Sequence, residues 1–242
     1  MQQELAFLFP DMETDRMDTD TVSAVNTHEK ILEHFQQEKI PVLIGTQMVA
    51  KGLNLPDVTL VGVLDADLSL YTGGFRAAET TFNMLTQVVG RAGRGDTEGR
   101  ALIQSMAPES PVIRMAAKQD YDSFYELEIN LRRLQNAPPF GDHATVTCVG
   151  QEETAVLRGA AKLRDSLVSL LKQPPYTQEI CTVLGPAPCV VPKINYNFRH
   201  QLTLRCRMTK NLRFLLAHLL REFAKDASNR GVSAFIDING FE

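Results

Sequence analysis

The sequence contains no tryptophan and only four cysteines among 242 residues. Cys148, Cys181, Cys189 and Cys206 are separated by 33, 8 and 17 residues, so no two of them have the spacing of a zinc-binding knuckle. A chain of this length also needs no disulfide framework to compensate for a small core. The pattern argues against a metal site in this chain, and we expect buried free thiols in a reducing cytosol.

Long apolar runs are missing as well. No segment reaches the roughly 18 apolar residues that a membrane-spanning helix requires, which excludes an integral membrane protein. The first residues, Met1 to Phe7, include Glu4 and no basic residue, so we predict no secretory signal peptide. Hydrophobic residues make up 44% of the chain and charged residues 22%, as in soluble globular proteins of one or two domains.

Acidic residues are absent from one long stretch, since residues 180–221 contain no Asp or Glu. The net charge of −4 hides an asymmetry: residues 1–107 carry 8 Lys or Arg against 15 Asp or Glu, and residues 108–242 carry 17 against 14. A cationic stretch that includes Tyr196 and Phe198 indicates a nucleic-acid surface. A solvated face that merely lacks acids explains the charge equally well. The basic residues of the stretch are Lys193, Arg199, Arg205, Arg207, Lys210, Arg213 and Arg221.

The first half of the chain alternates between strand and helix patterns. Apolar residues at helical spacing predict helices over 28–38 and 79–90. Continuous apolar runs predict strands over 42–44 and 58–64, each buried on both faces, and a further strand covers 100–106. This alternation predicts an α/β domain with a parallel sheet over residues 1–107.

The second half has a different rhythm. Helical patterning over 112–134 ends at the Ala-Pro-Pro-Phe-Gly run of residues 137–141, so we predict a helical linker over 108–141. The remaining segments predict an α+β domain over 142–242 with the βαββαβ order of a ferredoxin-like unit. Its strands are expected at 143–149, 180–184 (before a Gly-Pro-Ala-Pro turn), 201–208 and 232–238, and its helices at 156–171 and 211–227.

The strand expected at 201–208 alternates strictly between apolar and polar residues. Leu202, Leu204, Cys206 and Met208 form its apolar face. Gln201, Thr203, Arg205 and Arg207 form the opposite, polar face.

A first candidate site follows the strand expected at 42–44. In an open α/β sheet, ligands bind at the carboxyl ends of the strands. Gly45 and Gly52 permit close approach of the backbone, and Thr46 with neighbouring amides suits a phosphate. Many strand-to-helix loops contain Gly and Thr, so this signal is weak by itself.

A second candidate site lies at the end of the helix expected at 79–90. Arg91 and Arg94 stand three residues apart, each beside a glycine. Because a guanidinium group can bind two phosphate oxygens, this arrangement suits arginine fingers that stabilise a transferring phosphoryl group. The alternative is a basic helix end that complements the helix dipole.

Together the two segments resemble motifs V and VI of superfamily 2 helicases, and several longer runs resemble the PriA family of primosomal replication-restart DNA helicases (primosomal protein N′). The resemblance implies a RecA-like second motor lobe over 1–107 and the family's C-terminal domain after it. The runs are residues 44–52, 63–67, 75–82, 85–95, 132–140 and 183–188, and motif VI reads Gln87-x-x-Gly90-Arg91-x-Gly93-Arg94.

The resemblance also implies roles for matched residues. Thr46 and Gln47 would contact the DNA strand, and Gly52 would lie where the ATP and DNA sites communicate. Arg91 and Arg94 would face the ATP phosphates, with Arg94 the preferred finger. Gln87 would lie near the nucleotide, as would Asn54, which stands where many helicases carry an Asp and so leaves the ribose contact open.

Motifs that the whole machine needs are missing. The sequence has no Gly-x-x-x-x-Gly-Lys-Ser/Thr, no DEAD- or DEAH-type box and no cysteine before Cys148. We therefore expect a C-terminal part of such a helicase, with Met1 at a natural or artificial truncation. ATP and Mg²⁺ would bind mostly to the other lobe, and the family's zinc-binding cysteine cluster would also lie outside this chain. Asp65 and Asp67 are expected to fix the following loop rather than to catalyse.

The sequence is compatible with two functions. The chain is either part of an ATP-dependent DNA helicase for replication restart and primosome assembly at stalled or branched forks, inactive alone, or a DNA- and protein-binding module of the primosome. In both, the DNA surface would include Arg199, Arg205 and Arg207. The resemblance implies forked or single-stranded DNA, primosome proteins and single-stranded DNA-binding protein as partners, and the bacterial cytoplasm as the location. Another superfamily 2 helicase, acting on RNA, is a weaker option.

Overall fold

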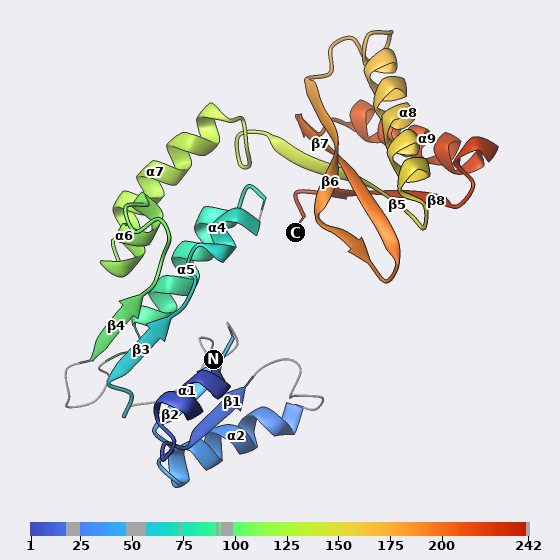
Figure 1. The fold of residues 1–242 in the computed structure, drawn as a ribbon. Helices are drawn as coiled ribbons and strands as arrows, with labels where there is room; N and C mark the ends of the chain where they lie inside the picture. The colour runs from blue at the N-terminus through green and yellow to red at the C-terminus, as the bar shows by residue number, and fades with distance from the viewer. Residues whose placement is uncertain (18–24, 47–56, 73, 91, 93–98, 241–242) are drawn as a thin grey trace. The chain divides into compact units, whose positions relative to one another are not determined.

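A computed structural model describes residues 1–17, 25–46, 57–72, 74–90, 92 and 99–240 (Figure 1). The chain forms two compact units: residues 1–71 with 78–124, and residues 72–77 with 125–242. The domain boundaries expected from the sequence stay predictions. No helix in the described ranges is long and apolar enough to cross a membrane.

The first unit begins with a small parallel sheet. Helix α1 (Gln2–Leu8) and strand β1 (Thr14–Met17) precede helix α2 (Val25–Gln37) and strand β2 (Val42–Gly45). Strands β1 and β2 pair in parallel, with Thr14 opposite Val42 and Met17 opposite Gly45. Helix α1 and strand β1 were not predicted from the sequence, because their short segments carry no clear apolar periodicity.

A second parallel pair forms the rest of this unit. Strand β3 (Leu60–Val63) pairs with β4 (Arg100–Ile103), and helices α4 (Leu68–Thr72), α5 (Ala77–Val89) and α6 (Pro111–Ala117) accompany them. Phe82 of α5 stacks on Phe124 with ring centroids 4.1 Å apart. The buried cluster around this pair consists of Ala66, Phe82, Leu85, Ile113, Ala116 and Phe124.

Two expectations for this unit need correction. Parallel pairing is confirmed, but the described strands form two separate two-stranded sheets. Strands β2 and β3 are not buried on both faces: the residues of β2 are at most half-buried and Leu60 of β3 is 58% exposed. An apolar run favours a strand, but whether both faces are covered depends on the placement of other segments.

The helical stretch at 112–134 is divided into two helices, which corrects the single pattern expected there. Helix α6 ends at Ala117 and α7 (Tyr121–Leu134) begins four residues later. Gln119 has a φ of +55°, which no helix accommodates. The Asp120 carboxylate then accepts a hydrogen bond from the Ser123 amide over 3.1 Å and so starts the next helix.

The second unit contains a four-stranded antiparallel sheet in the order β6-β7-β5-β8. Its elements follow one another as β5 (Asp142–Gly150), α8 (Glu153–Leu171), β6 (Cys181–Ile194), β7 (Asn197–Cys206), α9 (Lys210–Lys225), a 3-10 turn at Ala227–Asn229 and β8 (Val232–Ile238). The predicted ferredoxin-like βαββαβ order is confirmed.

The core of this unit lies between one face of the sheet and the two helices. Leu202, Leu204 and Cys206 of β7 are fully buried, which confirms the apolar face expected for that strand. All four cysteines are thiols outside disulfide bonds: Cys148, Cys189 and Cys206 are buried, and Cys181 is half-buried. Burial raises the pKa of the Cys148 thiol to about 11, with a smaller contribution from Cys189.

The expected Gly-Pro-Ala-Pro turn is a bulge within a strand. Strand β6 continues through Gly185 and Pro186 to Ile194, with a register shift against β7 between Leu184 and Ala187. Gly185 has a φ of +97°, and proline cannot donate to a ladder. Because β6 is an edge strand, the sheet tolerates both residues there.

Candidate nucleic-acid interface

Most residues expected to serve the motor lie outside the described residues: Gln47, Gly52, Asn54, Arg91 and Arg94. Two are described. Thr46 directly follows β2, at the carboxyl end of the strand, and is exposed. Gln87 is exposed two residues before the end of α5. Both lie at element ends open to solvent, where a ligand can reach them.

Asp67 has a structural role. Its carboxylate is 3% exposed and accepts hydrogen bonds from the Ser105 hydroxyl over 2.8 Å and the Met106 amide over 2.6 Å. Burial raises the pKa of this carboxyl, but the hydrogen bonds outweigh it and hold the pKa below its usual range. Asp67 therefore fixes the loop after β4 rather than the loop that follows it in sequence. Asp65, with a φ of +53°, occupies the turn before α4.

The second unit has an open sheet face, opposite the one that packs on α8 and α9. Register places Arg199, Gln201, Thr203 and Arg205 of β7 on this face, across from Val149, Thr147, Thr145 and His143 of β5. Arg205 is exposed, and Arg199 is half-buried and donates to the Val191 carbonyl over 3.5 Å. Arg207 is exposed one residue beyond β7. The structure thus brings Arg199 and Arg205 together on one face, as the alternation predicted.

The hairpin that connects β6 to β7 adds cations to this region. Lys193 lies opposite Phe198, with its ammonium nitrogen 4.3 Å from the centre of the Phe198 ring. Tyr196, in the turn, is 85% exposed. The whole hairpin lies in the stretch without acidic residues.

The comparisons with known proteins match both halves of the chain. The model of the helicase conserved C-terminal domain matches residues 4–96, and that of the primosomal protein N C-terminal domain matches residues 133–240. The replication restart protein PriA of Bacillus subtilis is 37% identical over 241 residues, which are 100% of this chain and 29% of that protein. The chain belongs to the PriA family.

Other PriA relatives agree. The replication restart protein PriA of Synechocystis is 39% identical over 81% of this chain and 23% of its own length. That of Treponema pallidum is 36% identical over 94% of this chain and 34% of its own length. The chain therefore spans about a third or less of these PriA relatives.

In a cluster that the sequence did not predict, a segment of the helicase-like half contacts the C-terminal domain within the second unit. Phe75, within the second unit, contacts His143 near the start of β5 and Arg132 of α7. The guanidinium carbons of Arg76 and Arg132 lie 4.8 and 5.5 Å from the centre of the Phe75 ring. Arg76 also donates to the Asn239 carbonyl over 3.5 Å. Local patterns cannot reveal contacts between residues this far apart in the sequence.

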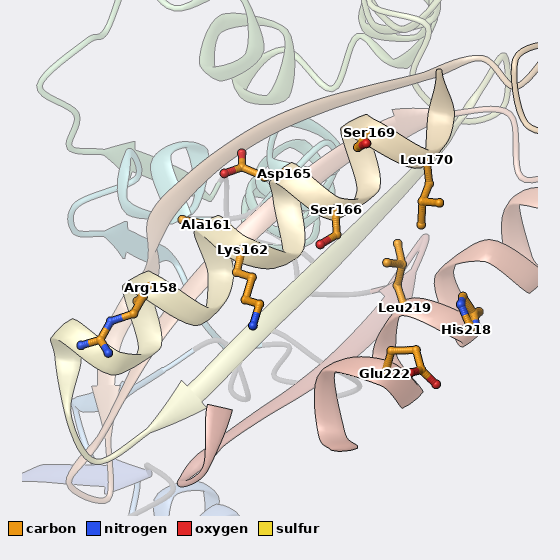
Figure 2. A pocket seen from close by; sticks show the side chains of 10 residues that line it. All are labelled: Arg158, Ala161, Lys162, Asp165, Ser166, Ser169, Leu170, His218, Leu219 and Glu222. Carbon is orange, nitrogen blue, oxygen red and sulfur yellow. The ribbon is translucent and has the colours of Figure 1, made fainter. Parts of the chain in front are cut away.

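A groove of about 770 Å³ lies between α8 and α9 (Figure 2). Leu170 and Leu219 face each other at one end, and Lys162 points toward α9. Three charged residues that line the groove pair within the domain: Lys162 with Asp226, Asp165 with Arg164, and Glu222 with Lys225. The groove therefore offers balanced charge, unlike the acid-free hairpin. Among the residues that the structure describes, no group of three or more His, Cys, Asp or Glu side chains is placed to hold a metal ion.

Proposed function

We propose that this chain supplies the second motor lobe and the C-terminal domain of an ATP-dependent DNA helicase for replication restart and primosome assembly at stalled or branched forks. The observation that carries the proposal is that one family model matches each half of the chain and a single PriA relative aligns with both halves. In this proposal the chain acts in the bacterial cytoplasm with other primosome proteins and single-stranded DNA-binding protein.

The motor lobe would act through the residues that match the helicase motifs. Thr46 and Gln47 would bind the phosphates of the DNA strand, and Arg91 and Arg94 would stabilise the ATP phosphates, with Gln87, Gly52 and Asn54 near the nucleotide. The exposure of Thr46 and Gln87 is compatible with these contacts. Mg²⁺ and most nucleotide contacts would come from the other lobe, because no phosphate-binding Gly-Lys-Ser/Thr loop stands in these 242 residues.

An exchange experiment tests the helicase role. The aligned part of the Bacillus subtilis relative is replaced by this chain, and DNA unwinding and ATP hydrolysis are measured. We expect the chimera to unwind forked DNA and the same chimera with Arg94→Ala to lose DNA-stimulated hydrolysis. The isolated chain should hydrolyse no ATP. Hydrolysis by the pure chain, or an active Arg94→Ala chimera, would contradict the assignment.

The C-terminal domain would bind DNA through the open face of its sheet. Arg199 and Arg205 share that face and Arg207 follows directly, while register also places Asp237 of β8 there, opposite Thr145. Phosphate contacts of this kind weaken steeply with salt, because binding releases condensed counterions. A binding module without its own catalysis is the second candidate, favoured by the self-contained core of this domain.

Charge reversal tests this face. Arg205→Glu with Arg207→Glu should lower affinity for forked DNA at low salt and reduce the slope of log affinity against log salt by about two. Arg158→Glu with Arg221→Glu is the matched control, because both arginines are exposed on the helices instead. Equal losses in the two double variants would show that net charge, not the face, determines binding.

A further inference from the structure

The tip of the β6–β7 hairpin has a conformation that its sequence does not favour. Lys193 pairs with Phe198 and Ile194 with Asn197, which leaves only Asn195 and Tyr196 to reverse the chain. Both have positive φ, +48° and +64°, as in a type I′ turn. Asn tolerates this region, whereas the second position is usually glycine, and a bulky side chain there is strained.

The Tyr196 ring is costly in a second way, since it is 85% exposed to solvent. Neither cost serves the fold, because the ring packs on little else and glycine would satisfy the turn better. Backbone strain retained without a packing benefit points to a role outside the fold. A side chain held outward at a hairpin tip is placed to contact a partner. In Figure 1 this turn is the end of the β6–β7 ribbon that points away from α8 and α9.

The charge around the tip selects the class of partner. Lys193 is held beside the turn by its contact with the Phe198 ring, on the face that packs on the helices. Arg199 lies on the open face of the same hairpin, three residues after Tyr196. Cations therefore flank the tip on both faces, and the nearest acids in sequence are Glu179 and Glu222. This arrangement is complementary to a polyanion.

We propose that the β6–β7 tip is a contact for single-stranded nucleic acid, in which the Tyr196 ring stacks on an unpaired base and Lys193 binds an adjacent phosphate. Stacking requires a base whose face is accessible, which a closed duplex does not offer. The inference deepens the proposed DNA binding by the C-terminal domain, on which it rests. In this proposal the tip binds single-stranded DNA, whereas the open face of the sheet contacts the phosphates of duplex DNA.

The turn provides an unusually clean variant. Tyr196→Gly removes the ring and at the same time supplies the residue that the turn favours, so the unfolding temperature should stay equal or rise. Binding of this chain to an oligothymidylate and to a blunt duplex is measured by fluorescence anisotropy at low salt. We expect single-strand affinity to fall roughly five- to a hundredfold and duplex affinity to stay unchanged. Tyr196→Trp should retain single-strand binding, and Lys193→Gln should lower it and reduce its salt slope by about one.

A direct readout of stacking completes the test. A single 2-aminopurine in the oligonucleotide should change fluorescence on binding to the wild type and Tyr196→Trp, and not on binding to Tyr196→Gly. If Tyr196→Gly binds single strands as the wild type does, while Arg205→Glu with Arg207→Glu loses affinity, the proposal for the tip is overturned. The proposed function then still stands. Equal losses for single strand and duplex also overturn it. A wild-type chain that binds neither DNA overturns both proposals.

Discussion

The rings of Phe75 and His143 meet edge to face, with centroids 5.4 Å apart and planes inclined at 66°. Phe75 belongs to the helicase-like half of the sequence, and His143 is the second residue of β5, the first strand of the C-terminal domain. Register places His143 opposite Arg205 on the open sheet face. A segment of the helicase-like half therefore contacts the same sheet face that we propose for DNA binding.

The contact between these rings should be measurable by a double-mutant cycle. Phe75→Ala should destabilise the second unit by about 2 kcal/mol, because it removes one aromatic pair and two arginine contacts. Phe75→Ala and His143→Ala should couple by about 0.5–1.5 kcal/mol. Chemical denaturation gives both values. Tyr71→Ala is the control, since Tyr71 is 75% exposed and should change stability little. Additive losses at Phe75 and His143 would contradict the contact.

Arg132 connects this cluster to helix α7. Its guanidinium donates to the Glu128 carboxylate over 2.7 Å, and both side chains are only 14% exposed. Arg132→Met should cost about 2–4 kcal/mol, because it leaves the Glu128 charge shielded from water and unpaired. The double variant Arg132→Met with Glu128→Leu should recover most of that loss. A double variant as unstable as Arg132→Met would show that packing, not the ion pair, determines the effect.

Much of the C-terminal domain was predictable, because its patterns are local. Alternation over 201–208 placed Leu202 and Leu204 in the core and Arg205 outside, and the structure agrees. The bulge at Gly185 was not predictable, since a Gly-Pro pair ends a strand as readily as it bends an edge strand. Whether the Gly-Pro pair ends the strand or bends it depends on how β6 pairs with the whole of β7.

The candidate site shows the same division. Arg199 and Arg205 followed from period-2 alternation, whereas the Tyr196 tip depends on a two-residue turn that sequence favours with Asn-Gly rather than Asn-Tyr. The contact between Phe75 and His143 spans 68 residues of sequence, and no local pattern reports it. Long-range contacts are therefore what the structure adds.

Acid should weaken the second unit through Asp142. Its carboxylate accepts from the Met208 amide and from Asn239 over 2.8 Å each. The hydrogen bond from the Met208 amide holds the pKa of Asp142 below its usual range, although burial acts in the opposite direction. The hydrogen bond from Asn239 and the charges of Arg213 and Arg207 lower the pKa further. Because this pKa is lower in the folded than in the unfolded state, ionised Asp142 stabilises the fold above about pH 4. That stabilisation is lost as the pH falls through the lowered pKa.

Asp142→Asn keeps the shape of the side chain and removes its titration. Denaturation midpoints measured between about pH 7 and pH 2 should fall less steeply for this variant than for the wild type. Asp237→Asn, on the exposed edge strand β8, serves as the control. Parallel pH profiles for wild type and Asp142→Asn would rule out the contribution of this carboxylate.

Substitutions at two glycines should distinguish the effect of steric crowding on stability from that of backbone strain. Gly185 and Gly231 both have positive φ, +97° and +84°. A Cβ at Gly185 would lie 2.7 Å from the Gln201 carbonyl oxygen, whereas one at Gly231 would meet nothing within 4 Å. Gly231→Ala should therefore cost about 1 kcal/mol, from strain alone. Gly185→Ala should cost about 2–4 kcal/mol, because the β6–β7 ladder must also shift. Urea denaturation followed by circular dichroism measures the free energy of unfolding of both variants. Equal losses of stability would mean that the bulge at Gly185 accommodates a Cβ without shifting β7.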